Sequence, residues 1–167
     1  LREVGTSSPP GAQGGAYRVY LQTTLRQFVE ADNFGSLIRP ELTNVQGIQQ
    51  LLQAKDVSGQ LFLAETHKKA LQALRQADYL SPKYHVVIAN PPYMGGKGMN
   101  GSLKTFLQEN YSEYKSDLFS AFVVRCSDLG VKQSNIGVMS PNVWMYISSH
   151  ENLRTFLTES CALYSLV

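Results

Sequence analysis

The feature that most constrains the fold is a β-branched run at residues 86–88, Val-Val-Ile, that two prolines soon stop. A continuous run of this kind predicts a strand that is buried on both faces of a parallel sheet. Pro91 and Pro92 have no backbone N–H to donate, and Pro91 also pushes Asn90 toward extended geometry. The Asn-Pro-Pro-Tyr motif of residues 90–93 is therefore expected at the carboxyl end of a strand, where open α/β sheets bind ligands.

The groups in this motif suit a planar aromatic amine. The side-chain oxygen of Asn90 and the carbonyl of Pro91 can each accept one N–H of an amino group, while the Tyr93 ring stacks on the heterocycle. Accepting both protons localises the nitrogen lone pair for attack on an electrophile. The alternative is a proline-rich turn that merely follows a buried strand, since Asn-Pro is a common turn starter.

With Asn first and Tyr last, the motif resembles that of S-adenosylmethionine-dependent DNA methyltransferases of the adenine-N6 class. Residues 115–122 and 135–142 resemble the helix and the next strand of these enzymes. Residues 32–38 and 90–100 are most similar to the PglX methyltransferases of bacterial BREX phage-defence systems. The resemblance implies an α/β fold, specifically a partial Rossmann-like S-adenosylmethionine-dependent methyltransferase fold with a mostly parallel sheet and flanking helices.

The resemblance also assigns a chemistry to the motif. The target adenine is flipped out of double-stranded DNA, and its N6 attacks the sulfonium methyl group directly, with no metal ion. Other proteins of a defence system are further possible partners that it implies. The resemblance implies catalytic roles for four consecutive residues: Asn90, Pro91, Pro92 and Tyr93.

The cofactor implied by the resemblance is S-adenosylmethionine, with Asn90 beside it. The glycine-rich first motif of these families, and the acid that follows it, do not occur in the 167 residues. We therefore interpret the sequence as an internal fragment, with residues 17–167 belonging to the catalytic side of the domain, and expect it neither to bind the cofactor tightly nor to turn over alone.

By position, Asp32 would contact the adenine of the cofactor if residues 28–32 form a strand; a loop Asp that caps its neighbours is the alternative.

Residues 96–101, Gly-Lys-Gly-Met-Asn-Gly, match the GxGxxG pattern of dinucleotide-binding proteins. That fingerprint needs its first glycine directly after the strand, and a six-residue segment intervenes here. We interpret the segment as a mobile loop beside the active site, in which Lys97 and Lys104 approach DNA phosphates. A flexible surface loop without function is the alternative.

Apolar periodicity predicts the remaining elements. Helices are expected at residues 44–80 and 118–129, the latter ending near Gly130, and a further helix after a capping box at residues 148–151. Strands are expected at residues 136–139 and 162–167, which completes the alternation of a doubly wound sheet. Residues 1–16 are expected to be flexible. The cluster at residues 144–146, Trp-Met-Tyr, is interpreted as packing rather than as a base pocket.

The three histidines carry no recognisable site. His67 falls on the polar side of a predicted helix and is expected to be solvated. His85 and His150 have no acidic or nucleophilic partner at a recognisable spacing. Cys126 is expected to be a small buried hydrophobe, and with Cys161 it is too little for a zinc cluster or a disulfide framework.

Length and charge leave the function open. A chain of 167 residues is about one domain, and a net charge of +2 neither supports nor excludes DNA binding. No secretory signal or membrane-length apolar run is present, so a reducing cytoplasm is the expected location. A catalytically silent nucleic-acid-binding or complex-forming module, and an amine methyltransferase acting on RNA or protein, remain alternatives.

Overall fold

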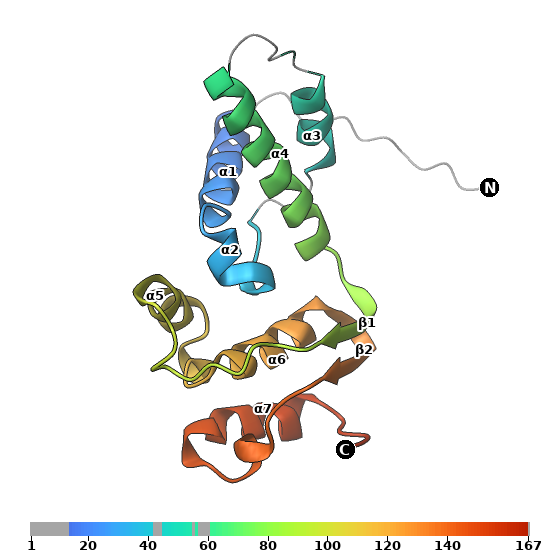
Figure 1. Cartoon of the computed structure of the whole chain (residues 1–167). Coiled ribbons are helices and arrows are strands. Elements are labelled where there is room, and N and C mark those ends of the chain that lie inside the picture. Colours follow the sequence, from blue (N-terminus) through green and yellow to red (C-terminus); the bar gives the residue numbers. More distant parts are fainter. Residues whose placement is uncertain (1–13, 42–44, 55, 57–60, 167) are drawn as a thin grey trace, which may run out of the picture. The chain divides into compact units, whose positions relative to one another are not determined.

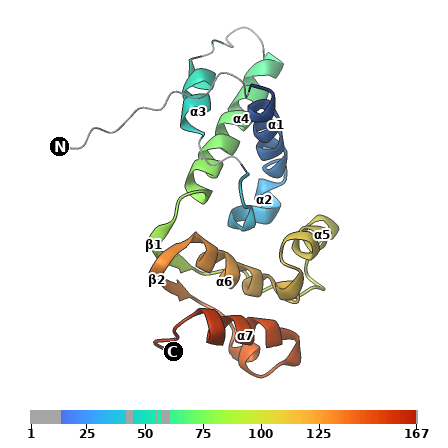
Figure 2. The same cartoon turned by 180° about the vertical axis from the view of Figure 1, so that it is seen from behind.

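A computed structural model describes residues 14–41, 45–54, 56 and 61–166 (Figures 1 and 2). The chain divides into two compact units. The first consists of residues 1–29 and 40–79, and the second of residues 30–39 and 80–167. The motif at residues 90–93 lies in the second unit.

The described part of the first unit is helical. It contains α1 (Gly14–Gln27), α3 (Gln46–Gln53) and α4 (Leu61–Leu80), whose last residue belongs to the second unit. The helices predicted over residues 44–80 are thus confirmed, whereas α1 was not predicted, and residues 14–16, expected to be flexible, form its start. Residues 1–13 lie outside the described part. His67 is not simply solvated as expected, because its Nε2 atom lies 2.6 Å from the carbonyl oxygen of Leu52 and links α4 to α3.

The second unit is an α/β structure built on two parallel strands. β1 (Tyr84–Ala89) pairs with β2 (Gly130–Val138), and α6 (Leu118–Leu129) contacts both strands. The predicted fold class, α/β with parallel strands and flanking helices, is confirmed. The other elements of the unit are α2 (Ala31–Phe34), η1 (Gly35–Leu37), α5 (Gly101–Asn110), η2 (Ser112–Tyr114), η3 (Asn142–Met145), η4 (Ser148–His150) and α7 (Glu151–Ser160).

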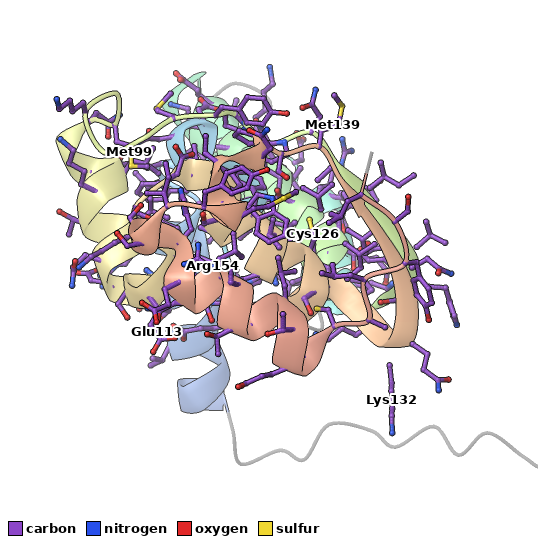
Figure 3. All side chains as sticks on the ribbon, turned by 90° about the horizontal axis from the view of Figure 1, so that it is seen from below. Met99, Glu113, Cys126, Lys132, Met139 and Arg154 are labelled. Carbon is purple, nitrogen blue, oxygen red and sulfur yellow. The ribbon has the colours of Figure 1, made fainter. Side chains whose placement is uncertain are left out.

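The parallel register brings the ends of the two strands together. Val86 pairs with Asn135, and the pairing continues without interruption to Ala89 and Val138. Before it the register shifts, and Gln133 adopts a left-handed φ of 66° in the bulge. In the view of Figure 3, the side chain of Lys132, in the same bulge, extends away from β2.

The strand is present as predicted, but its burial is not. Val86 and Ile88 are 57% and 82% exposed, whereas Val87 and Ala89 are partly covered. Val86 and Ile88 point to the same face of the strand, so that face carries no covering layer among the described residues. The expectation of a strand buried on both faces is therefore wrong for this part of the chain.

Two apolar clusters hold the helices of the second unit. In the first, Phe34 stacks on Phe106 with ring centroids 4.2 Å apart. The second contains buried Trp144, with Met145 packed against it, which confirms the packing interpretation; Tyr146, however, is 73% exposed. Cys126 is buried, as expected. The buried members of the first cluster are Leu37, Met99, Leu103, Leu107, Tyr111, Leu118 and Ala121, and those of the second are Phe119, Trp144 and Leu153.

Three local predictions differ from the structure, and one helix of this unit was not predicted. Residues 28–32 form a turn and the start of α2 instead of a strand, and residues 162–166 have no regular structure. The helix α7 begins after His150 without a side-chain cap, so the expected capping box at residues 148–151 does not form. The helix α5 was not predicted, although Asn100 caps it by accepting a hydrogen bond from the N–H of Leu103.

A buried guanidinium joins separate segments of this unit. Arg125 on α6 is only 5% exposed, and it donates hydrogen bonds of 2.9 Å to the carbonyls of Ser36, Ile38 and Leu80. Burial lowers its pKa. Gly35 supports the geometry, because its φ of 54° turns the chain after α2 in a conformation that side chains disfavour.

Tyr111 and Arg39 reinforce the same junction. The Tyr111 hydroxyl donates a 2.7 Å hydrogen bond to the carbonyl of Leu37, and burial raises the pKa of Tyr111 to about 12. The guanidinium of Arg39 pairs with Asp128 and lies 4.3 Å from the centroid of the Tyr111 ring. Residues 36–39 are thus held against α6 and the end of α5.

We expect Arg125→Met to lower the free energy of unfolding by about 2–4 kcal/mol, because three carbonyls lose their donor in a buried place. Urea denaturation followed by the fluorescence of Trp144, the single tryptophan of the chain, measures this change. Arg75→Met, at an exposed position of α4, is the matched control and should change stability by less than about 0.5 kcal/mol. Equal stability of the two variants would contradict the structural role of Arg125.

Candidate active site

The Asn-Pro-Pro-Tyr motif directly follows β1 and has no regular secondary structure. Pro91 is buried, whereas Asn90 and Pro92 are exposed and Tyr93 is 53% exposed. A buried proline between two exposed side chains fixes the backbone while leaving the amide and the phenol ring accessible. Three of the four predicted catalytic residues, Asn90, Pro92 and Tyr93, are therefore accessible at the carboxyl end of a parallel strand, and Pro91 is buried between them.

Hydrogen bonds fasten this motif at both ends. Before it, the Ala89 carbonyl accepts a 3.0 Å hydrogen bond from the N–H of Met139, which follows β2. After it, the N–H of Met94 donates to the Oδ1 atom of Asp117 at 3.1 Å, and the Met94 carbonyl accepts from the N–H of Leu118 at 3.0 Å. Only the four motif residues lie between these two attachments.

The segment after the motif is a short turn that leads into α5. The N–H of Gly98 donates to the Gly95 carbonyl at 2.9 Å, and α5 begins at Gly101. Lys97 on the turn and Lys104 on α5 are both exposed. Their predicted contact with DNA phosphates remains a prediction.

Asp32 was predicted to contact the cofactor because residues 28–32 were expected to form a strand that ends at this residue. It is exposed on the one-turn helix α2 and does not end a strand, so its assignment to the cofactor remains a prediction without that support. Its neighbour Asn33 exchanges hydrogen bonds of 3.2 and 2.9 Å with the side chain of Asn100. This pair links α2 to the loop that follows the motif.

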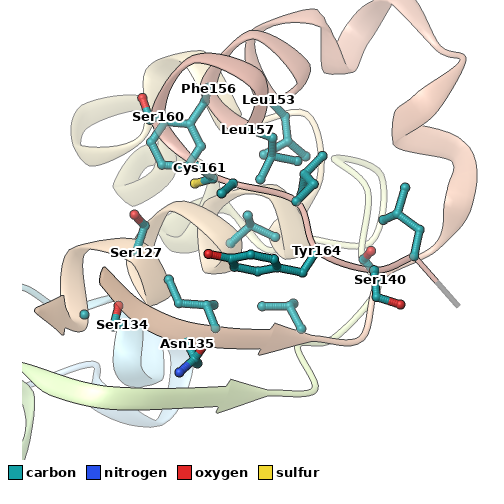
Figure 4. A pocket seen from close by; sticks show the side chains of 18 of the residues that line it. Ser127, Ser134, Asn135, Ser140, Leu153, Phe156, Leu157, Ser160, Cys161 and Tyr164 are labelled. Atoms are coloured by element: carbon teal, nitrogen blue, oxygen red, sulfur yellow. The ribbon is translucent and has the colours of Figure 1, made fainter. Parts of the chain in front are cut away.

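A separate cavity of about 620 Å³ runs along β2 and α7 (Figure 4). Its lining includes apolar side chains such as Phe156 and Leu157, and the hydroxyls of Ser127 and Ser134. In Figure 4 the Tyr164 ring extends over β2. The lining contains no carboxylate and none of residues 90–93, so this cavity does not fit a cofactor that carries an ammonium and a sulfonium group.

Comparison with known proteins identifies the family. Residues 19–167 match the profile of the Eco57I restriction-modification methylase family. The chain belongs to this family. It is 34% identical over 143 residues to the adenine-specific methyltransferase BrxX of Escherichia coli O9:H4 (strain HS), covering 84% of the chain. It is 30% identical over 141 residues to the adenine-specific methyltransferase PglX of Lacticaseibacillus casei (strain Zhang), covering 80% of the chain. In each case the match spans 12% of the relative's length.

The side chains that hold the motif of this methylase domain were not among the predicted site residues. Asp117 caps α6 by accepting a 3.2 Å hydrogen bond from the N–H of Phe119, and the same oxygen accepts from Met94. An Asp directly before an apolar helical run is a recognisable capping signal. Its second bond joins residues 23 positions apart, and no local pattern announces that contact.

His150 has hydroxyl partners that its sequence neighbours do not suggest. Its Nδ1 atom lies 3.1 Å from the Ser120 hydroxyl and 3.4 Å from the Ser116 hydroxyl, while Ser116 also donates to the Ser149 carbonyl. Burial lowers the pKa of His150; Arg154 acts in the same direction and the Asp117 carboxylate opposes it. This cluster joins the start of α6 to the start of α7.

No group of three or more His, Cys, Asp or Glu side chains that could hold a metal ion occurs in the part of the chain that the structure covers. Within the same residues, no helix combines the length and the apolar character needed to cross a membrane.

We expect acid to destabilise this cluster. The pKa of His150 in the folded state lies below its unfolded value of about 6.5, so in this pH range the unfolded state binds more protons than the folded state. The stability that neutral His150 contributes is therefore complete above about pH 6.5 and is lost as pH falls through the folded pKa. Urea unfolding at pH 7.5 and pH 5 should show a larger loss for the wild type than for His150→Asn, whose side-chain oxygen can still accept from Ser120. An equal loss in both proteins would contradict the assignment.

Proposed function

We propose that this chain carries the base-capturing motif of an adenine-N6 DNA methyltransferase, in a restriction-modification or phage-defence context. The observation that carries the proposal is the exposed Asn90 and Tyr93 around buried Pro91, at the carboxyl end of a parallel strand. Membership of the Eco57I methylase family, and two relatives named as adenine-specific methyltransferases, support the same assignment.

In the proposed mechanism the chain holds the amine that is to be methylated. The Asn90 amide oxygen and the Pro91 carbonyl each accept a hydrogen bond from one N6 N–H of a flipped adenine, and Tyr93 stacks on the ring. These acceptors also stabilise the positive charge that develops on N6 in the transition state. Because hydrogen bonds hold the backbone at both ends of the motif, these acceptors are oriented before the base arrives.

S-adenosylmethionine is the proposed methyl donor: it would supply the methyl group that N6 attacks and leave as S-adenosylhomocysteine, and N6 would release one proton. Asn90 would lie beside this cofactor. The cavity along β2 and α7 has no carboxylate in its lining to face the cofactor's positive charges, so we assign no cofactor contact to it.

Double-stranded DNA is the proposed substrate. Lys97 and Lys104 are exposed on the segment after the motif and can approach phosphates on the strand that carries the flipped base. Such contacts weaken with salt, because phosphate binding releases condensed counterions.

Asn90→Ala in the intact protein should lower the rate of methyl transfer at least about a hundredfold, because one positioned polar contact at a reacting atom commonly contributes that much. The assay uses labelled S-adenosylmethionine, unmodified DNA and nucleoside analysis of the product. The expected product is N6-methyladenine.

A matched control separates this effect from folding. Asn152→Ala removes an exposed Asn on α7, whose hydrogen bond to the Glu113 carbonyl measures 3.4 Å, and should leave turnover unchanged. Wild-type turnover in Asn90→Ala would remove Asn90 from its proposed role. If the wild type transfers no methyl group to DNA, an amine in RNA or protein, or a silent binding module, becomes the better account.

Replacing Tyr93 tests the stacking. Tyr93→Ala should weaken capture of the base by about 1–3 kcal/mol, whereas Tyr93→Phe should be mild, because the ring and not the hydroxyl makes the proposed contact. Binding of the intact protein to a duplex with a mismatched, easily flipped adenine measures both. Equal losses in the two variants would assign the contact to the phenol oxygen instead.

A further inference from the structure

We propose that Asp117 is a positioning residue for the Asn-Pro-Pro-Tyr motif, a role that rests on the proposed methyl transfer. Met94 directly follows Tyr93, and its N–H donates a 3.1 Å hydrogen bond to Oδ1 of Asp117. Asp117 therefore controls the peptide plane that leaves the aromatic residue of the motif.

The position of Asp117 is itself fixed by α6. The same Oδ1 atom accepts the 3.2 Å hydrogen bond from the N–H of Phe119, and the two residues that follow Asp117 are buried, with Leu118 5% and Phe119 0% exposed. Packing of these side chains keeps the carboxylate at one place at the N-terminus of the helix. One oxygen thus connects a rigid helix start to the end of the motif.

Backbone contacts add to this attachment but do not replace it. Gly95 and Asp117 form an isolated antiparallel bridge, and the N–H of Leu118 donates to the Met94 carbonyl at 3.0 Å. These contacts hold the chain from Met94 onward. The N–H of Met94 is the one backbone donor between these contacts and Tyr93, and it bonds to the Asp117 carboxylate.

The expected consequence concerns turnover more than binding. Displacing a reacting group by about 1 Å can cost roughly a hundredfold in rate, because the transition state tolerates less misalignment than the bound substrate. Loss of the Asp117 acceptor should therefore lower kcat while the DNA concentration needed for half-maximal rate changes little. Asp117 touches neither the base nor the cofactor in this proposal.

Three variants of the intact protein separate positioning from helix capping. Asp117→Asn keeps an oxygen at the Oδ1 position, Asp117→Ser keeps a helix cap but is too short to reach Met94, and Asp117→Ala removes both bonds. We expect kcat to fall at least about tenfold in the Ser and Ala variants, with KM for DNA within about threefold of wild type, and the Asn variant to retain most of its activity.

Hydrogen exchange read by mass spectrometry supplies a measurement that does not depend on activity. Exchange at the Met94 amide should accelerate at least about tenfold in Asp117→Ser and Asp117→Ala, but not in Asp117→Asn, if this bond protects it. Wild-type exchange and turnover in the Ser variant would overturn the proposal and leave Asp117 as a cap only.

Two other outcomes are also decisive. Equal loss of kcat in all three variants would overturn the proposal, because the charge and not the acceptor geometry would then matter. A wild-type protein that transfers no methyl group to DNA would refute the proposed function, whereas the exchange data would still decide whether Asp117 holds the end of the motif.

Discussion

The second unit depends on one buried positive charge. Arg125 donates to carbonyls from Ser36, Ile38 and Leu80, segments that are far from it in the sequence. A guanidinium can serve this purpose because its planar donors reach several acceptors at once, while burial alone would disfavour the charge. Through these bonds the segments around residues 36–38 and residue 80 are held against α6.

The candidate site is built from the other end of this helix. Asp117 at its start holds Met94, and Ala89 is held by Met139 after the neighbouring strand. The four motif residues thus lie between two attachment points, one at the start of α6 and one at the end of β2, and Pro91 among them is buried. Such an arrangement suits a site that has to orient a substrate amine, because little backbone freedom remains to be lost on binding.

Much of this arrangement is predictable from local sequence. The β-branched run before Pro91 predicts β1, and the apolar spacing from Leu118 predicts α6, because both patterns reflect the residue period of a single element. The prediction fails where partners are distant: Asp32 lies on a helix instead of at a strand end, and Ile88 is exposed although its run is typical of a buried strand. Burial depends on what covers a strand, and that information is not in the run itself.

The sequence by itself determined the motif, its place after a strand, and the family chemistry that these imply. Only the tertiary structure decided that Asp117 contacts Met94, that Asn33 pairs with Asn100, and that His150 meets two serines. These contacts join residues 23 to 67 positions apart. Local periodicity specifies the conformation of each element, whereas the choice of distant hydrogen-bond partners follows from how the elements pack, because the donors and acceptors meet only after the core has formed.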